Sequence, residues 1–107
     1  MSSALIESLL EEMYQDDYFP DFLVEQVQEL LAVELVEFFS DEDTHEEAQE
    51  QLDFVTLQLN DLAAVFEENG SEFETVARDS IGASIESILD HYKIEIEIED
   101  AIRLREW

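Results

Sequence analysis

Residues 44–70 give the clearest structural signal in this chain: THEEAQEQLDFVTLQLNDLAAVFEENG. Thr44 and Glu47 have the spacing of a capping box, in which each side chain binds the backbone N–H of the other residue at a helix start. Apolar residues then recur at the spacing of one helix face, namely Ala48, Leu52, Val55, Leu59, Leu62 and Phe66. Asn69-Gly70 suits a helix C-terminus, because glycine readily adopts the left-handed conformation found there. The segment predicts a long amphipathic helix.

Two further helices are predicted before this segment. Pro20 suits the first turn of a helix, since its missing N–H would have no partner there. The helix it opens ends at the turn formed by residues 40–43, and its buried stripe is predicted to be Leu23, Val27, Leu30, Leu31, Leu35 and Phe38. An earlier helix is predicted from Ser3 to Tyr14, with Ser2 or Ser3 as N-cap and with apolar residues at helical spacing, namely Leu5, Ile6, Leu9, Leu10 and Met13.

A fourth helix is predicted after Gly70. Ser71 and Glu74 have the spacing of a second capping box, and the stripe that follows consists of Phe73, Ala77, Ile81, Ser84, Ile85, Ile88 and Tyr92. Residues 94–98 alternate like a strand, but a lone strand has nothing to pair with. We therefore expect an extended link into a short helix over residues 98–103, with Trp107 packing back on the bundle.

These elements predict an all-α fold. The chain has 107 residues, which suit one domain with one hydrophobic core. It contains one proline and two glycines, and we find no linker or repeat that would divide it. We predict a single-domain bundle over residues 1–107, built from four amphipathic helices plus a short C-terminal helix.

The charge of the chain is extreme. Thirty Asp and Glu residues stand against four Lys and Arg, a formal net charge of -26, while the apolar content of 46% is too high for a disordered tail. Self-repulsion of this size opposes folding, so we expect the charge to attract and steer a basic protein partner. Nucleic acid and anionic membranes are excluded as direct ligands, because proteins bind both through Lys and Arg.

The compartment is predicted to be the cytoplasm. The chain has no cysteine, which excludes disulfides and thiolate chemistry and fits a reducing environment. Its first residues lack the basic region of a signal peptide, and no apolar stretch approaches the roughly 20 residues needed to cross a bilayer.

No pattern in the sequence is typical of an enzyme. Close pairs of carboxylates are uninformative where acids are so frequent. His45 and His91 fit no zinc-binding spacing, and residues 41–47 lack the ligand order and the central glycine of an EF-hand. A Gly-rich phosphate loop and a Ser/His/Asp signature are also missing. We therefore predict no catalytic residue, no cofactor and no metal site.

The acidic residues instead form rows that predict a binding surface. Asp21, Glu25 and Glu29 step by four, which places carboxylates one helical turn apart without a cation between them. Such a row can imitate the phosphates of a nucleic-acid strand. The residues predicted to bind the partner are Asp21, Glu25, Glu29, Asp41, Glu42, Asp43, Glu46 and Glu47, followed by Asp16, Asp17 and Tyr18.

Tyr18 has two interpretations that the sequence leaves open. A ring beside carboxylates suits an interface that receives Arg or Lys. Alternatively, Tyr18 and Phe19 form a hydrophobic staple at the helix start marked by Pro20.

Three segments resemble a small acidic bacterial family of unknown function: EMYQDDYFP at residues 12–20, ENGSEFETVAR at residues 68–78 and REW at residues 105–107. The resemblance spans nearly the whole chain and implies a single-domain helical protein, but it transfers no active-site residue. By type, the chain is also similar to the immunity proteins of contact-dependent growth inhibition toxins, many of which are RNases.

The preferred prediction is an immunity protein that binds a basic nuclease toxin, with an RNase as the expected class, and occludes its active site or nucleic-acid cleft. One alternative is a nucleic-acid mimic that inhibits a restriction enzyme, a CRISPR effector or another DNA-binding protein. A second alternative is an acidic structural or adaptor protein whose charge serves solubility. We expect a monomer when the protein is free, since the net charge opposes self-association.

Overall fold

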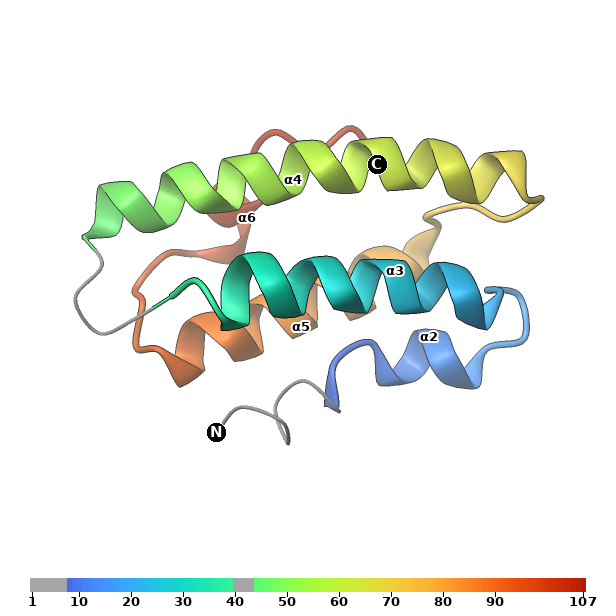
Figure 1. The fold of residues 1–107 in the computed structure, drawn as a ribbon, viewed down its shortest axis with the longest axis horizontal. Coiled ribbons are helices and arrows are strands. Elements are labelled where there is room, and N and C mark those ends of the chain that lie inside the picture. Colours follow the sequence, from blue (N-terminus) through green and yellow to red (C-terminus); the bar gives the residue numbers. More distant parts are fainter. Residues whose placement is uncertain (1–7, 40–43) are drawn as a thin grey trace.

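The structure is a computed structural model that describes residues 8–39 and 44–107. Its elements are α2 (Glu11–Gln15), α3 (Asp21–Leu31), the π-helical segment η1 (Ala32–Val36), α4 (His45–Glu68), α5 (Thr75–His91) and α6 (Ile98–Ala101). α3 and α4 are antiparallel neighbours along the long axis of the molecule (Figure 1). α2 packs against α3 and α5, and α6 bridges α4 and α5. The described residues form no strand, so the predicted all-α bundle is confirmed.

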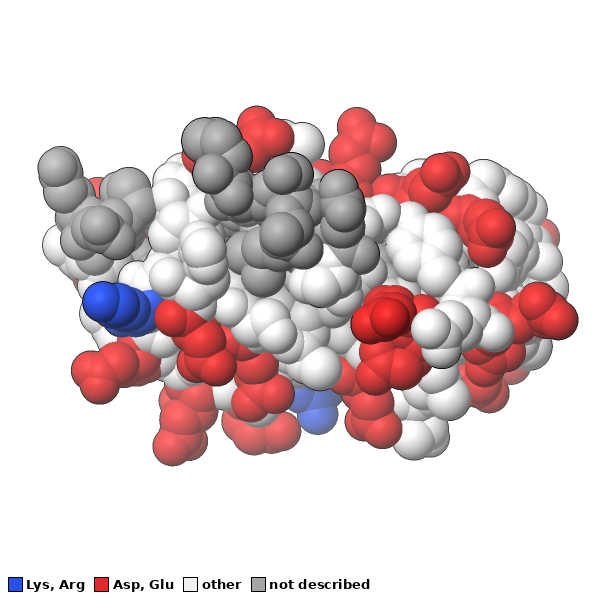
Figure 2. Space-filling view, turned by 90° about the horizontal axis from the view of Figure 1, so that it is seen from below, with Lys and Arg blue, Asp and Glu red and all other residues white. Residues whose placement is uncertain are grey.

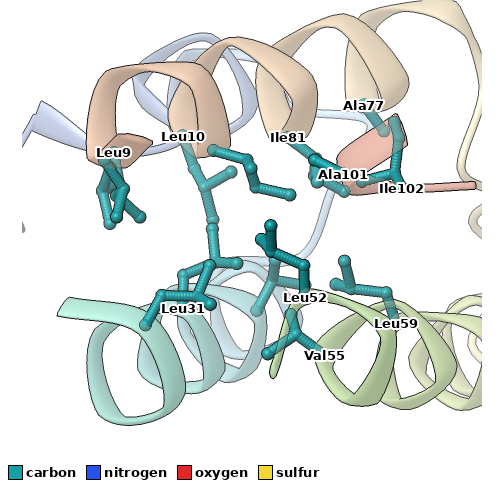
Figure 3. Packing of buried hydrophobic residues seen from close by; sticks show 14 of the residues in the cluster. Leu9, Leu10, Leu31, Leu52, Val55, Leu59, Ala77, Ile81, Ala101 and Ile102 are labelled. Carbon is teal, nitrogen blue, oxygen red and sulfur yellow. The ribbon is translucent and has the colours of Figure 1, made fainter. Parts of the chain in front are cut away.

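The hydrophobic core lies between α3, α4 and α5 and is closed by α6 (Figure 3). Leu31 of α3, Leu52 of α4 and Ile81 of α5 point into it and are essentially unexposed. Ala101 and Ile102 of the C-terminal segment also pack into this core and are buried. Each fully buried aliphatic side chain contributes about 1.5–3 kcal/mol relative to exposure, so this cluster is the main source of stability.

α4 has the two ends that the sequence predicts. The N–H of Glu47 donates to Thr44 Oγ1 at 3.1 Å, and the N–H of Thr44 donates to Glu47 Oε1 at 2.9 Å, which confirms the capping box. At the other end Gly70 has φ +77°, and the N–H of Ser71 donates to the carbonyl of Phe66 at 2.8 Å. This is the Schellman arrangement of a helix C-terminus. The predicted stripe is buried apart from Leu62, which is half-buried.

α3 begins directly after Pro20, which is its extended N-cap and not, as predicted, a residue of its first turn. The last residue of the predicted stripe, Phe38, is also wrong. The N–H of Glu37 donates to the carbonyl of Ala32 at 2.9 Å, five residues back, which is the bond of a π-helix. This wider turn shifts the following side chains by one position. Phe39 is therefore buried at 4% exposure, while Phe38, which was predicted to be buried, is 46% exposed.

The predicted first helix is interrupted where the structure describes it. Leu10 has a left-handed backbone with φ 59°, and α2 starts only after it, at Glu11. The N–H of Leu10 donates to Ser84 Oγ of α5 at 3.0 Å, and both Leu9 and Leu10 are 1% exposed. Packing against α5 thus overrides the local helical pattern. Residues 2–7 of this prediction lie outside the described residues.

The predicted second capping box does not form. Ser71 is 1% exposed, its N–H is used at the end of α4, and its hydroxyl donates to the carbonyl of Tyr18 at 3.3 Å. The hydroxyl is thus directed at the α2–α3 loop, and α5 starts at Thr75, after Glu74, without a side-chain cap. The predicted stripe of α5 is nevertheless buried, with Tyr92 half-buried.

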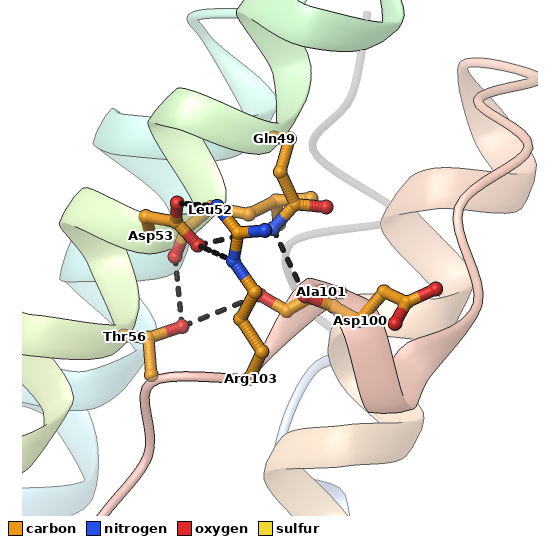
Figure 4. A network of polar contacts seen from close by, with 7 residues as sticks. All are labelled: Gln49, Leu52, Asp53, Thr56, Asp100, Ala101 and Arg103. Carbon is orange, nitrogen blue, oxygen red and sulfur yellow. Dashed lines mark hydrogen bonds and ion pairs between the residues drawn. The ribbon is translucent and has the colours of Figure 1, made fainter.

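The C-terminal segment forms the expected link and short helix and is held on α4 by a row of polar side chains (Figure 4). Gln49 Nε2 donates to the carbonyl of Asp100 at 2.9 Å, and Arg103 pairs with Asp53. Further along, Thr56 Oγ1 donates to the carbonyl of Ala101 at 3.4 Å, and Asn60 binds the backbone of Leu104 and Glu106. The ring of Trp107 packs edge-on against Phe73 with centroids 5.5 Å apart, which confirms that the chain end folds back.

Candidate protein-binding surface

One end of the bundle gathers acidic side chains around Tyr18. This tyrosine lies in the loop between α2 and α3, beside Asp16 and Asp17, and is 40% exposed. The hydrogen bond from Ser71 to its carbonyl brings the loop between α4 and α5 alongside, with the acids Glu72 and Glu74. We call this surface the acidic end and define it as Asp16, Asp17, Tyr18, Asp21, Glu25, Glu72 and Glu74.

The loop that presents Tyr18 is fixed by its neighbours. Asp16 Oδ1 accepts the N–H of Tyr18 at 3.0 Å, which is an Asx turn. Phe19 is 2% exposed, and its ring contacts Phe66 of α4 and the ring of Tyr18, with centroid distances of 6.4 and 5.1 Å. Phe19 anchors the loop in the core and leaves Tyr18 and Asp17 exposed.

Carboxylates at this end act on two nearby tyrosines, in addition to the larger effect of burial. Burial, followed by the charges of Glu72 and Glu74, raises the pKa of Tyr18 above its ordinary value. The pKa of Tyr14 on α2 is also raised, first by burial and then by the charges of Glu25 and Asp21. Nearby negative charges disfavour the tyrosinate and attract an incoming cation. The acids of the α4–α5 loop therefore act on Tyr18, and those at the start of α3 act on Tyr14.

The predicted row on α3 is divided by the structure. Asp21 and Glu25 lie on the side of α3 that faces Tyr14, whereas Glu29 lines a groove between α3 and α4. The reason is helical geometry, since residues four apart advance by about 40° around the axis and a row of three drifts off one face. The row therefore contributes two residues to the acidic end and one to the groove.

The remaining predicted residues lie elsewhere. Glu46 and Glu47 are exposed at the start of α4, at the opposite end of the molecule from the α2–α3 loop (Figure 1). Glu47 is engaged in the capping box, and the hydrogen bonds from Thr44 lower the pKa of its carboxyl. Asp41, Glu42 and Asp43 lie outside the described residues. The predicted residues thus do not form one continuous surface.

Glu72 and Glu74 were missed by sequence reasoning. They lie some fifty residues beyond Tyr18, and only the antiparallel course of α3 and α4 returns the chain to the same end. The length of α4, 24 residues between its capping box and Gly70, was the one available signal. A helix of that length spans about 36 Å, close to the 40 Å long axis of the molecule.

Few cations offset the acidic surface. Figure 2 shows the face on which α2 lies, where acidic side chains are spread widely with few Lys or Arg among them. Ion pairs among the described residues are confined to the C-terminal segment, where Arg103 meets Asp53 at 2.6 Å and Arg105 meets Glu99 at 3.8 Å. The described carboxylates of the acidic end therefore remain available to an external cation.

Other kinds of site are weakly represented in the part of the chain that the structure describes. No group of His, Cys, Asp or Glu there has the geometry to hold a metal ion. A cavity of about 350 Å³ between α5 and the C-terminal segment is lined by Arg78, Arg105, Glu86 and Glu99, among others, so its charge is mixed. None of the described helices combines the length and apolar character required of a membrane span.

The chain belongs to DUF5713, a family of unknown function whose model matches residues 4–107. No curated protein and no solved structure matches it significantly. The resemblance to a family of unknown function is therefore confirmed over nearly the whole chain. The assignment names no activity, so function has to be argued from the surface itself.

Proposed function

We propose that this protein is a cytoplasmic immunity protein that binds a basic nuclease toxin through the acidic end. The toxin is expected to be an RNase, and binding occludes its active site or its nucleic-acid cleft. The supporting observation is that carboxylates of the α2–α3 and α4–α5 loops lie beside the exposed Tyr18, and that Asp21 and Glu25 of α3 lie near Tyr14, without an ion pair to any of them among the described residues. The free protein is a monomer in this proposal, because its charge opposes self-association.

A nuclease, like other proteins that bind nucleic acid, fits this surface for a physical reason. Nucleases hold the phosphates of their substrates with Lys and Arg, which makes the cleft a concave cationic surface. In the acidic end, Asp21 and Glu25 lie one turn apart on α3, a spacing near 5.4 Å, and the two loops supply the other carboxylates. They replace phosphates without presenting a bond that the enzyme can cleave.

The acidic end is also organised before binding. Phe19 fixes the α2–α3 loop in the core, and the Ser71 hydroxyl joins that loop to the α4–α5 connection. A prearranged surface loses less conformational entropy on association than a mobile one. The repulsion among its acids is relieved when cations arrive, which adds to the affinity. Both effects favour tight and salt-sensitive binding to a basic partner.

The test has two stages. The protein is used as bait in an extract of its source cell at about 0.1 M salt and washed at about 0.5 M, where screening weakens charge pairs. The retained basic protein is then purified, and its nuclease activity is measured against increasing amounts of this protein. Stoichiometric inhibition at low salt is expected.

Two outcomes would revise the proposal differently. A retained DNA-binding protein without toxin or nuclease activity would remove the immunity assignment and support a nucleic-acid mimic. Recovery of no basic protein at either salt would remove both, and would leave the charge as a feature of a structural or adaptor protein.

A further inference from the structure

A second surface lies apart from the acidic end, in the groove between α3 and α4. Its volume is about 410 Å³, and its apolar lining comes from Leu30 and Val33 on one side and Leu62 and Val65 on the other. Acids line both sides as well, Glu29 and Glu34 from the α3–η1 side and Asp61 from α4. The lining contains no Lys or Arg.

The two sides of the groove have partly similar sequences. Residues 22–33 read FLVEQVQELLAV and residues 54–65 read FVTLQLNDLAAV, with identical Phe, Gln, Leu, Ala and Val at matching positions. Glu29 and Asp61, both acidic, also match. Because α3 and α4 run antiparallel (Figure 1), the matching residues follow one another in opposite directions on the two sides of the groove.

Helical spacing places further large apolar side chains, outside the groove lining itself, on the same helix faces. Phe22, Gln26, Glu29 and Val33 are spaced four, three and four residues apart, as are Phe54, Gln58, Asp61 and Val65, so each set lies on one face of its helix. Phe22 is 54% exposed, Phe54 is 45% exposed and Val33 is 45% exposed. Exposed apolar surface of this kind, rimmed by polar residues, is typical of a binding site.

The charge of the lining decides what can occupy the groove. A second copy of the chain would bring Glu29, Glu34 and Asp61 against the same three acids, between molecules of formal charge -26 each. Like charges placed together in this way oppose association. The occupant must therefore offer an apolar stripe with positive charge on both sides of it.

We propose that the α3–α4 groove binds one amphipathic helix of another protein. Apolar side chains at helical spacing lie on Leu30, Val33, Leu62 and Val65, and Lys or Arg on each flank pair with Glu29, Glu34 and Asp61. The bound helix packs along α3 and α4 as a third member of the bundle, with axes about 8–10 Å apart. This proposal does not rest on the nuclease assignment, because the groove shares no residue with the acidic end.

The probe is a synthetic helical peptide of about 18 residues with a Leu stripe flanked by Lys and Arg. Two control peptides separate the contributions: a scrambled peptide of identical composition lacks the stripe, and a third peptide has Glu in place of Lys and Arg. Binding to the full chain is measured by fluorescence anisotropy at about 0.1 M salt. We expect the stripe peptide to bind at least tenfold more tightly than either control.

Variants of the protein locate the site. Val33→Asp places a third negative charge on the α3–η1 side of the groove and is expected to weaken binding of the stripe peptide at least tenfold. The control Val76→Asp, at an exposed site on α5, should leave this binding unchanged. Amide chemical shifts should change within residues 26–34 and 58–65. Circular dichroism confirms that both variants are folded.

Several results would overturn the proposal. These are undetectable binding of the stripe peptide, equal binding of the scrambled peptide, or shift changes confined to residues 16–25 and 72–74. A concentration-dependent dimer of the free protein that Val33→Asp abolishes would assign the groove to a second copy instead. None of these outcomes depends on whether a nuclease partner exists.

Discussion

Arg103 and Asp53 form a two-point ion pair across fifty residues of sequence. Arg103 Nη2 lies 2.6 Å from Asp53 Oδ2, and Arg103 Nε donates to Asp53 Oδ1 at 3.1 Å. The pair holds the segment after α6 on the side of α4. Among the residues that the structure describes, it is one of two ion pairs between a carboxylate and a cation of the chain.

The Asp53→Asn variant should therefore be less stable than the parent protein in a pH-dependent way. The hydrogen bond from Arg103 is the largest cause that lowers the pKa of Asp53 in the folded state. A lowered folded pKa gives stability that is complete above the unfolded value, about 3.9, and is lost as the pH falls through the folded pKa. Urea unfolding between pH 7 and pH 2.5 should show the difference shrinking below pH 4. A constant difference would contradict this.

The π-helical turn predicts opposite results for two adjacent phenylalanines. Phe39→Ala removes a ring that is 4% exposed and should cost about 3–5 kcal/mol of unfolding free energy. Phe38→Ala, at 46% exposure, should cost about 1 kcal/mol or less. Chemical denaturation of the two variants measures both costs. Larger destabilisation by Phe38→Ala would mean that the segment continues as a regular α-helix.

The hydroxyl of Ser84 has a structural role that its exposed neighbour Ser87 lacks. Ser84→Ala leaves the buried N–H of Leu10 without this acceptor, which should cost about 1–3 kcal/mol. Ser87→Ala on the same helix should change stability by about 0.5 kcal/mol or less. Hydrogen exchange of the Leu10 amide should accelerate only in the Ser84 variant. Equal effects of both substitutions would refute the role of this bond.

Added salt should raise the melting temperature. A net charge of -26 opposes the compact state, and an increase from 0.01 to 0.1 M NaCl shortens the screening length from about 30 Å to about 10 Å. Each kcal/mol gained raises Tm by roughly 4 °C in a domain of this size. Calorimetry across this series measures the gain. A Tm that falls with salt would mean that favourable ion pairs outweigh the self-repulsion.

Local signals predicted the fold well where they were strong. The capping box at Thr44 and the glycine at position 70 fixed both ends of α4, and the apolar stripe of α5 was correct. The errors arose where tertiary contacts decide. Leu10 leaves the helical conformation to bind Ser84, and Ser71 binds Tyr18 instead of capping α5. Neither partner is near in sequence, so no local pattern could indicate it.

The acidic end was predictable only in part. Asp16, Asp17, Tyr18, Asp21 and Glu25 were named from sequence and do lie at one end of the bundle. Glu29 was grouped with them because the spacing of four was taken as one face, although such positions drift around the helix axis. Glu46 was grouped with them because the length of α4, which places it at the other end, was not considered. Which loops share an end depends on how antiparallel helices pack, and this information is not local. Whether these residues bind the partner stays a prediction.

The central claim is that a basic partner binds the acidic end. The most direct measurement is the affinity of the recovered nuclease, by isothermal titration calorimetry at 0.1 M salt, for two variants with equal charge change. Asp17→Asn with Glu25→Gln and Glu72→Gln alters the acidic end, and Glu37→Gln with Glu46→Gln and Glu50→Gln alters exposed acids near the opposite end. We predict at least a hundredfold loss for the first variant and less than a threefold loss for the second, the pattern of a localised set of charged hot spots. Equal losses would contradict the claim, because they would mean that overall charge, not this surface, attracts the partner.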